Sequence, residues 1–244
     1  MRVAVELWPA GAGRVPRALP GASVVIIDVL RATTTLTVAV THGATRILPF
    51  ASPEAALRHR ESDPASRACG ERDGRMVSGF DLGNSPAEYT RERVAGRTLA
   101  FASTNGSLAM RAVSRCRRRV LAAFVNAAAV VEALAGESQV LVLCAGRLGR
   151  FSIEDAACAG LLVERWAVRG ATLDGDGARL ARQLAPRDAA AVQALVEGAS
   201  HGRYLRSLGP VFAADVESCA RLDQLATVAE VRDADLSAAG PATS

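Results

Sequence analysis

Lysine is absent from this chain of 244 residues, so apart from three histidines every basic side chain is an arginine. This absence excludes Schiff-base chemistry, and it excludes a phosphate-binding loop of the Walker type, which requires a lysine after its glycines. Any anion that the protein binds must therefore be held by guanidinium groups, by backbone N–H groups or through a metal ion.

Aromatic residues, paired cysteines and long apolar runs are also scarce. Aromatic residues make up 4% of the chain, so an aromatic platform for stacking nucleic-acid bases is not expected. The five cysteines form no CxxC pair, and with the three histidines they show no zinc-site spacing. No apolar run reaches the roughly 18–20 residues of a membrane span, and the first apolar stretch is too short for a signal peptide. We therefore expect a cytoplasmic protein that binds no membrane.

The net charge is +4, and the basic residues are spread along the chain with one tight cluster, the run RCRRR at 115–119. This run follows a predicted helix, and arginines are favoured at the negative C-terminal end of a helix. We interpret the run as a solvated helix end rather than a nucleic-acid surface. A nucleic-acid module would instead bind DNA or RNA with a steep dependence on salt, and no such binding is expected.

Short runs rich in β-branched residues alternate with longer alanine-rich stretches, which predicts strands alternating with helices. The predicted strands are Val3–Leu7, Val24–Asp28, Thr45–Phe50, Arg67–Cys69, Thr98–Ala102, Val120–Ala123 and Gln139–Cys144. The predicted helices are Thr33–His42, Pro53–Glu61, Asn105–Arg115, Ala127–Ala135 and Ser152–Arg169.

This alternation predicts an α/β fold with three layers, α/β/α, around a mostly parallel or mixed sheet. The runs VVII and VLVL are continuously apolar, as strands covered on both faces require. From about 171 to 220 the pattern shows no strand and predicts a helical C-terminal part. No low-complexity linker interrupts the chain, so we expect one domain over 1–236 and a flexible tail at 237–244.

Polar residues follow the most apolar predicted strand, in the segment VVIIDVLRATTT. Ligands of parallel α/β sheets bind at the carboxyl ends of the strands, which is where Asp28 and Arg31 stand. Asp28 offers a carboxylate for a magnesium ion, whereas Arg31 and the N–H groups of the next helix suit an anion. A structural interpretation stays open, in which a threonine caps the helix and Asp28 accepts hydrogen bonds within the turn.

Two further loops place polar residues at strand ends. The segment CGERDGRMVSGFDLGNSPAEYT is long, glycine-rich and charged, which is typical of a functional loop, and it offers Glu71, Arg72 and Asp81 as contacts. The segment FASTNGSLAM places Asn105 and Gly106 between a strand and a helix, where they could hold an oxyanion. A capped turn without a ligand explains this second segment equally well.

A fourth loop, in VLVLCAGRLGRFSIEDAACAG, places Arg147 between two glycines. Ser152 and Asp155 have the spacing of a capping box, which would give Asp155 a structural role. Capping does not explain Glu154, because adjacent carboxylates repel each other unless a cation lies near them. Together the four loops predict a site for magnesium and a small polyanion.

The same segments resemble a known family. IDVLRATTT, GER, GFDLGNSPAEY, TNG, FVNA, CAGRLGRFSIEDAACAG and DVESC occur in an order and at spacings similar to those of the 2-phosphosulfolactate phosphatase family. The resemblance covers roughly Val24 to Cys219. It implies a three-layer α/β fold and a magnesium-dependent phosphatase. The implied reaction converts (2R)-phospho-3-sulfolactate to 3-sulfolactate and phosphate, a step of coenzyme M biosynthesis.

The resemblance also implies roles for individual residues. Asp28 and Arg31 would be catalytic, and Asp28, Glu154 and Asp155 would be the ligands of Mg²⁺. Leu30 stands where phosphatases with an aspartate nucleophile carry a second acidic residue, so direct attack by water is preferred to an aspartyl phosphate. The substrate-binding residues would be Arg31, Thr33, Thr34, Arg72, Asn105, Gly106 and Arg147.

Several alternatives stay open. ASTNGS and Asp73 depart from the residues common in the family, which leaves room for another small phosphorylated hydroxy acid as substrate. A non-catalytic anion-binding protein would use the same carboxylates only as helix caps. Asp215 either closes the site or starts a helix, and the alanine-rich helix faces are compatible with a homo-oligomer.

Overall fold

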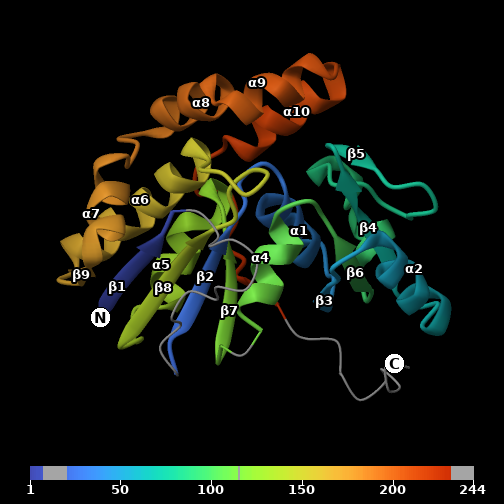
Figure 1. Cartoon of the computed structure of the whole chain (residues 1–244), viewed down its shortest axis with the longest axis horizontal. Coiled ribbons are helices and arrows are strands. Elements are labelled where there is room, and N and C mark those ends of the chain that lie inside the picture. Colours follow the sequence, from blue (N-terminus) through green and yellow to red (C-terminus); the bar gives the residue numbers. More distant parts are fainter. Residues whose placement is uncertain (8–20, 115, 232–244) are drawn as a thin grey trace.

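A computed structural model describes residues 1–7, 21–114 and 116–231 of the chain. The expected tail at 237–244 lies outside these residues, and the extent of a single domain over 1–236 stays a prediction. The expected α/β architecture, with helices on both faces of a sheet, is confirmed (Figure 1). Within the described stretches, every helix is too short or too polar to cross a membrane.

The larger sheet has six strands in the order β10–β7–β2–β8–β1–β9. Every neighbouring pair is parallel except β10 and β7, which are antiparallel. Because the inner strands are parallel, the carboxyl ends of β2 and β8 meet at one edge, with Ile27 opposite Cys144. The strands are β1 (Arg2–Glu6), β2 (Ser23–Ile27), β7 (Arg118–Ala122), β8 (Gln139–Cys144), β9 (Thr172–Asp174) and β10 (Ala229–Glu230).

The other strands form a separate, smaller sheet in the order β3–β6–β4–β5. The single sheet expected from the sequence is therefore wrong in this respect, because apolar patterns show that a strand is buried but not which sheet it joins. The first three of these strands are parallel to one another, and β5 is antiparallel to β4. The strands are β3 (Arg46–Pro49), β4 (Arg67–Arg72), β5 (Arg75–Met76) and β6 (Thr98–Ala102).

The central strand β2 is buried on both faces, which explains its continuous apolar run. Val25 and Ile27 belong to the core on one face, and Val24 and Ile26 to the core on the other. Helices α5 (Ala127–Ala133), α6 (Ile153–Val168) and α7 (Gly175–Gln183) cover the first face, and α1 (Ala32–Thr41) and α4 (Gly106–Ala112) the second.

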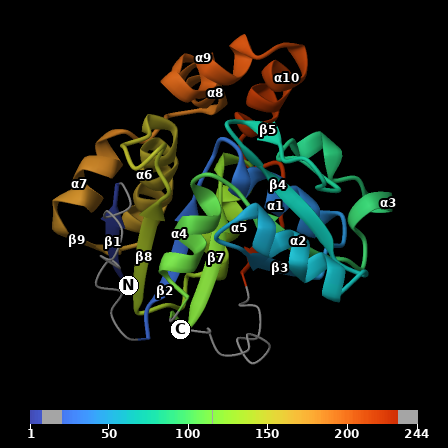
Figure 2. The same cartoon turned by 45° about the vertical axis from the view of Figure 1, so that its right-hand side comes forward.

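The smaller sheet shares the core of α1 and α4, so these two helices lie between the two sheets (Figure 2). Helix α2 (Pro53–Ser62) packs through Ala56 on the opposite face of the smaller sheet, against Ala68 and Ala100. Two short helical segments, η1 (Pro86–Glu88) and α3 (Arg91–Val94), lie between β5 and β6 of the smaller sheet. A third, η2 (Phe124–Asn126), follows β7 of the larger sheet.

The predicted helical C-terminal part is present above the carboxyl edge of the larger sheet (Figure 1). The expectation of no strand in this part is wrong, because β9 pairs with β1. Three residues at the end of a sheet are too few for a periodic apolar pattern to reveal a strand. After α7 the helices are α8 (Ala189–Gly198), α9 (Ser200–Ser207) and α10 (Pro210–Cys219).

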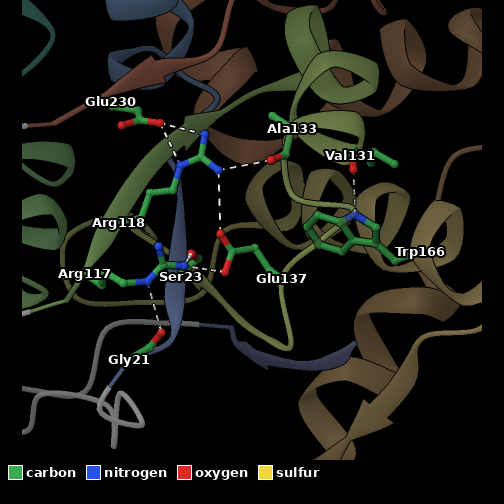
Figure 3. A network of polar contacts seen from close by, with 9 residues as sticks. All are labelled: Gly21, Ser23, Arg117, Arg118, Val131, Ala133, Glu137, Trp166 and Glu230. Carbon is green, nitrogen blue, oxygen red and sulfur yellow. Dashed lines mark hydrogen bonds and ion pairs between the residues drawn. The ribbon is translucent and has the colours of Figure 1, made fainter.

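The described part of the arginine run, 116–119, does not end a helix: α4 stops at Ala112, and β7 begins at Arg118. Arg117 donates to Glu137 at 2.5 Å and to the Ser23 hydroxyl at 3.2 Å, which ties the turn to the amino end of β2 (Figure 3). Arg118 donates to Glu230 of β10 at 2.7 Å. Arg118 therefore connects β7 to β10 through an ion pair, and Arg117 connects the turn before β7 to Glu137, which precedes β8.

Candidate active site

A cavity of about 50 Å³ lies where the carboxyl ends of the strands of both sheets meet. Asp28 comes from the end of β2, Thr104 follows β6 and Arg147 follows β8. Helix α9 covers the cavity from the C-terminal part. The lining residues are Asp28, Leu30, Arg31, Glu71, Asp73, Gly74, Asn84, Thr104, Asn105, Arg147, Leu148, His201, Tyr204 and Leu205.

Asp28 lies at the buried end of this cavity and is only 5% exposed. Its backbone N–H donates to the Thr33 hydroxyl at 3.0 Å, and that hydroxyl donates back to the Asp28 carbonyl at 2.8 Å. The carboxylate lies against Gly106, where a Cβ atom would stand 2.7 Å from Oδ2 of Asp28 and 2.6 Å from Cβ of Ala32. The turn thus fixes the backbone of Asp28, and Gly106 leaves the space that its side chain occupies.

The electrostatic surroundings of Asp28 disfavour its negative charge. Burial raises the pKa of Asp28 to about 8, with Glu71 and Glu154 adding to the shift and the Ala32 N–H and Arg31 opposing it. Burial, Asp28 and Glu154 likewise raise the pKa of Asp155 well above its usual value. A cation placed among these carboxylates would remove the repulsion between them.

Glu71 forms the second acidic wall of the cavity. One of its oxygens accepts from the Thr104 backbone N–H at 2.7 Å, and the other accepts from the Gly74 N–H at 2.8 Å and the Thr104 hydroxyl at 3.2 Å. These bonds join the end of β4 to the loop after β6. Glu71 is thereby held in position by both loops.

Arg31 lines the cavity, but its guanidinium is already paired with a carboxylate. Its Nη1 donates to Asp215 of α10 at 2.5 Å, and its Nη2 donates to the Gly74 carbonyl at 2.5 Å. Both members of the ion pair are 3% exposed at the side chain, and Arg31 also lies over the ring of Phe212. Asp215 also accepts from the Ser85 hydroxyl at 2.5 Å. It lies inside α10 and not at the start of that helix, and it connects α10 to the cavity through Arg31 and Ser85.

Arg147 supplies a positive charge at the more exposed end of the cavity. It has no carboxylate within ion-pair distance among the described residues, and its guanidinium carbon lies 4.6 Å from the ring centre of Tyr204. The Asn105 side chain accepts from the Leu148 N–H at 2.8 Å, which anchors the loop that carries Arg147. Leu148 itself is 65% exposed.

Glu154 and Asp155 are buried at the start of α6, but the expected capping box is not formed. The Ser152 side chain makes no cap hydrogen bond. The oxygens of Asp155 accept from the Val29 N–H at 2.9 Å and the Gly146 N–H at 3.0 Å, joining the loops after β2 and β8. Oε1 of Glu154 lies 3.4 Å from Nδ1 of His201.

Other residues predicted for the site lie beside the cavity rather than in its wall. The hydroxyl of Thr34 donates to the Val29 carbonyl at 2.9 Å, and that of Thr33 closes the Asp28 turn. Arg72 donates to the carbonyl of Glu71 at 2.7 Å. These side chains shape the loops around the cavity, and their contact with a substrate stays a prediction.

Sequence reasoning missed the contributions of Asn84, His201 and Tyr204 to the cavity wall. Asn84 stands inside GFDLGNSP, a segment already singled out, so that signal existed. His201 and Tyr204 belong to α9, whose sequence SHGRYLRS contains no motif that predicts a site. Only the packing of the C-terminal part over the sheet edge brings them to it.

The metal ligands expected from the sequence do not form a preformed site. Across 1–7, 21–114 and 116–231, no group of three His, Cys, Asp or Glu side chains could hold a metal ion. Two residues of the cavity wall nevertheless fit magnesium: Asp28 with its carboxylate, and Asn84, whose Oδ1 is buried without a hydrogen-bond partner in the described part. Magnesium is usually bound by one or two protein carboxylates, with water and substrate phosphate completing its shell.

The comparison with known proteins agrees with the motifs in these loops. A model of the family described as 2-phosphosulpholactate phosphatase matches residues 13–234. The chain belongs to this family. A probable 2-phosphosulfolactate phosphatase of Thermotoga petrophila is 40% identical over 204 residues, which cover 84% of this chain and 86% of the relative. The protein of the same name from Deinococcus radiodurans is 41% identical over 200 residues, covering 81% and 82%.

Several of the segments that resemble the 2-phosphosulpholactate phosphatase family line the cavity. DVLRATTT supplies Asp28 and Arg31, GFDLGNSP supplies Asn84, TNG supplies Asn105 and CAGRLGR supplies Arg147. The expected family membership is therefore confirmed, and the motifs converge on one place in the fold.

Replacing Gly106 with alanine should lower the activity of this 2-phosphosulpholactate phosphatase family member by displacing Asp28. The added Cβ would overlap both Asp28 and Ala32, and such overpacking costs about 1–3 kcal/mol of stability. Gly136→Ala is the matched control, because a Cβ there meets no atom within 4 Å. Turnover and thermal unfolding of both variants would be measured, and native turnover by Gly106→Ala would contradict the crowding argument.

Proposed function

We propose that this protein hydrolyses (2R)-phospho-3-sulfolactate to 3-sulfolactate and phosphate, with Mg²⁺ as its cofactor. The reaction would serve a pathway of the coenzyme M biosynthesis type. Membership of the family supports the reaction, as do relatives named probable 2-phosphosulfolactate phosphatases that are aligned over most of the chain.

The observation that carries the proposal is the distribution of charge along the cavity. Its buried end holds the carboxylates of Asp28 and Glu71, while the nearby charge of Arg31 is matched by Asp215. A phosphoryl dianion placed beside these two acidic groups would be repelled by each one that is ionised, strongly so in such a buried setting. The buried end therefore suits a phosphoryl group only together with a divalent cation.

Asp28 and Asn84 are the residues that would hold this cation, because both line the cavity and carry side-chain oxygens, and Oδ1 of Asn84 has no hydrogen-bond partner in the described part. When bound, magnesium would neutralise the phosphoryl oxygens and favour attack by water. Leu30 occupies the position of the second acidic residue of aspartate-nucleophile phosphatases, so we propose direct attack by water. The oxygen of water bonds to phosphorus, the ester P–O bond breaks, and the departing alcohol oxygen takes a proton.

Phosphate release from racemic phosphosulfolactate tests the proposal. The native chain should release phosphate with magnesium present and lose at least about tenfold of its rate when a chelator removes the metal. Folded protein that releases no phosphate would contradict phosphosulfolactate as the substrate. A rate that is unchanged by the chelator would contradict the cofactor assignment alone.

A further inference from the structure

We propose that Arg147, held over the ring of Tyr204, selects substrates by binding the anionic group farthest from the phosphoryl group. In phosphosulfolactate this group is the sulfonate. The inference deepens the proposed function and rests on it. It gives α9 of the C-terminal part a role in substrate choice.

Arg147 is the arginine of the cavity whose charge is available to a ligand. Arg31 also lines the cavity, but Asp215 and the Gly74 carbonyl hold its guanidinium at 2.5 Å each. Arg72 is absent from the cavity wall and donates to the carbonyl of Glu71. The guanidinium of Arg147 has only the Tyr204 ring as a partner among the described residues, so its N–H donors remain free for an anion.

Tyr204 determines where the guanidinium of Arg147 lies. The ring faces the guanidinium carbon at 4.6 Å, a distance at which cation–π attraction is effective. The Tyr204 hydroxyl donates to the Asp73 carbonyl at 3.3 Å, and the ring stacks near His201 with 6.4 Å between centres. Tyr204 is thus fixed from two sides and acts as a positioning residue.

The position of Arg147 distinguishes between the anionic groups of the substrate. Asp28 lies at the buried end of the cavity, whereas Arg147 is half-buried and precedes the exposed Leu148. In phosphosulfolactate the carboxyl carbon is bonded directly to the phosphorylated carbon, but the sulfur is one bond farther away. With the phosphoryl group beside Asp28, the sulfonate is therefore the group that the proposal assigns to Arg147. A guanidinium group can donate two hydrogen bonds to such an oxyanion.

The experiment compares kcat/KM for phosphosulfolactate and for 2-phospholactate, which keeps the carboxylate and lacks the sulfonate. In Arg147→Gln the ratio of the two values should fall about 10- to 100-fold, as expected for lost hydrogen bonds to a charged group. Tyr204→Leu should lower the ratio in the same direction, and Tyr204→Phe should preserve it because the ring remains. Arg150→Gln is the matched control, since Arg150 lies on the same loop outside the cavity wall.

An equal loss on both substrates in Arg147→Gln would overturn the inference while leaving the phosphatase function intact. An unchanged ratio in Tyr204→Leu would overturn the positioning role of the ring. Hydrolysis of neither substrate by the native chain would instead overturn the proposed function, and this inference with it.

Discussion

Replacing Asp28 with asparagine is expected to remove most of the activity and yet to stabilise the folded protein near neutral pH. Asparagine keeps the shape of the side chain beside Gly106 but loses the negative charge that would hold magnesium. Loss of one such electrostatic contact to a transition state lowers kcat by about 10²- to 10³-fold. Single-turnover phosphate release with the native chain and the variant would measure this loss.

The stability effect follows from the raised pKa of Asp28. In the folded protein this carboxyl keeps its proton up to a pH of about 8, whereas in the unfolded chain it releases the proton near pH ~4. The folded state therefore binds more protons between these values, so native stability falls as the pH rises through this range. The asparagine variant lacks this contribution.

Thermal unfolding without magnesium, followed from pH 5 to pH 8, checks this expectation. The melting temperature of the variant should exceed that of the native chain by an amount that grows with pH. Parallel curves would show that the Asp28 carboxyl titrates as an exposed group does, and would contradict the burial argument. Turnover equal to that of the native chain would remove Asp28 from the mechanism.

Replacing Asp215 with asparagine should cause the largest loss of stability. The change leaves the guanidinium of Arg31 buried at 3% exposure without its carboxylate partner. Breaking one side of a buried ion pair costs about 3–5 kcal/mol. For a protein of this size the melting temperature should fall by roughly 6–20 °C.

Glu132→Gln provides the control for this measurement, because it removes an ion pair with Arg169 whose side chains are 66% and 48% exposed. Exposed pairs contribute about 0–1 kcal/mol, so this variant should unfold almost as the native chain does. Chemical denaturation of both variants gives the two free energies. A loss below about 1 kcal/mol for Asp215→Asn would show that water or another group replaces the carboxylate beside Arg31.

Local patterns were sufficient to predict the elements of the sheets. The run VVII of β2 is apolar at every position because both faces of this strand are buried. Such a run can be recognised from the sequence alone. The division of the strands into two sheets was not predictable in this way. Strands β6 and β8 have similar apolar runs, and only their hydrogen-bonded neighbours place them in different sheets.

The same distinction applies to the cavity. The polar segments after β2, β6 and β8 could be identified because the carboxyl ends of parallel strands hold ligands, and Asp28, Asn105 and Arg147 line the cavity as expected. The sequence could not assign partners to these residues. Asp155 was expected in a capping box and at a metal, but its two oxygens accept backbone N–H groups from two different loops.

The sequence by itself determined the α/β architecture, the family and the loops that carry the polar residues, since each depends on short-range patterns. Only the tertiary structure decided which charges remain available. Arg31 is matched by Asp215, which lies 184 positions away, while Arg147 is left to the ring of Tyr204. The charge that a side chain presents to a ligand depends on its partners in space, and partners so distant in the chain meet only when the C-terminal helices pack over the sheet edge.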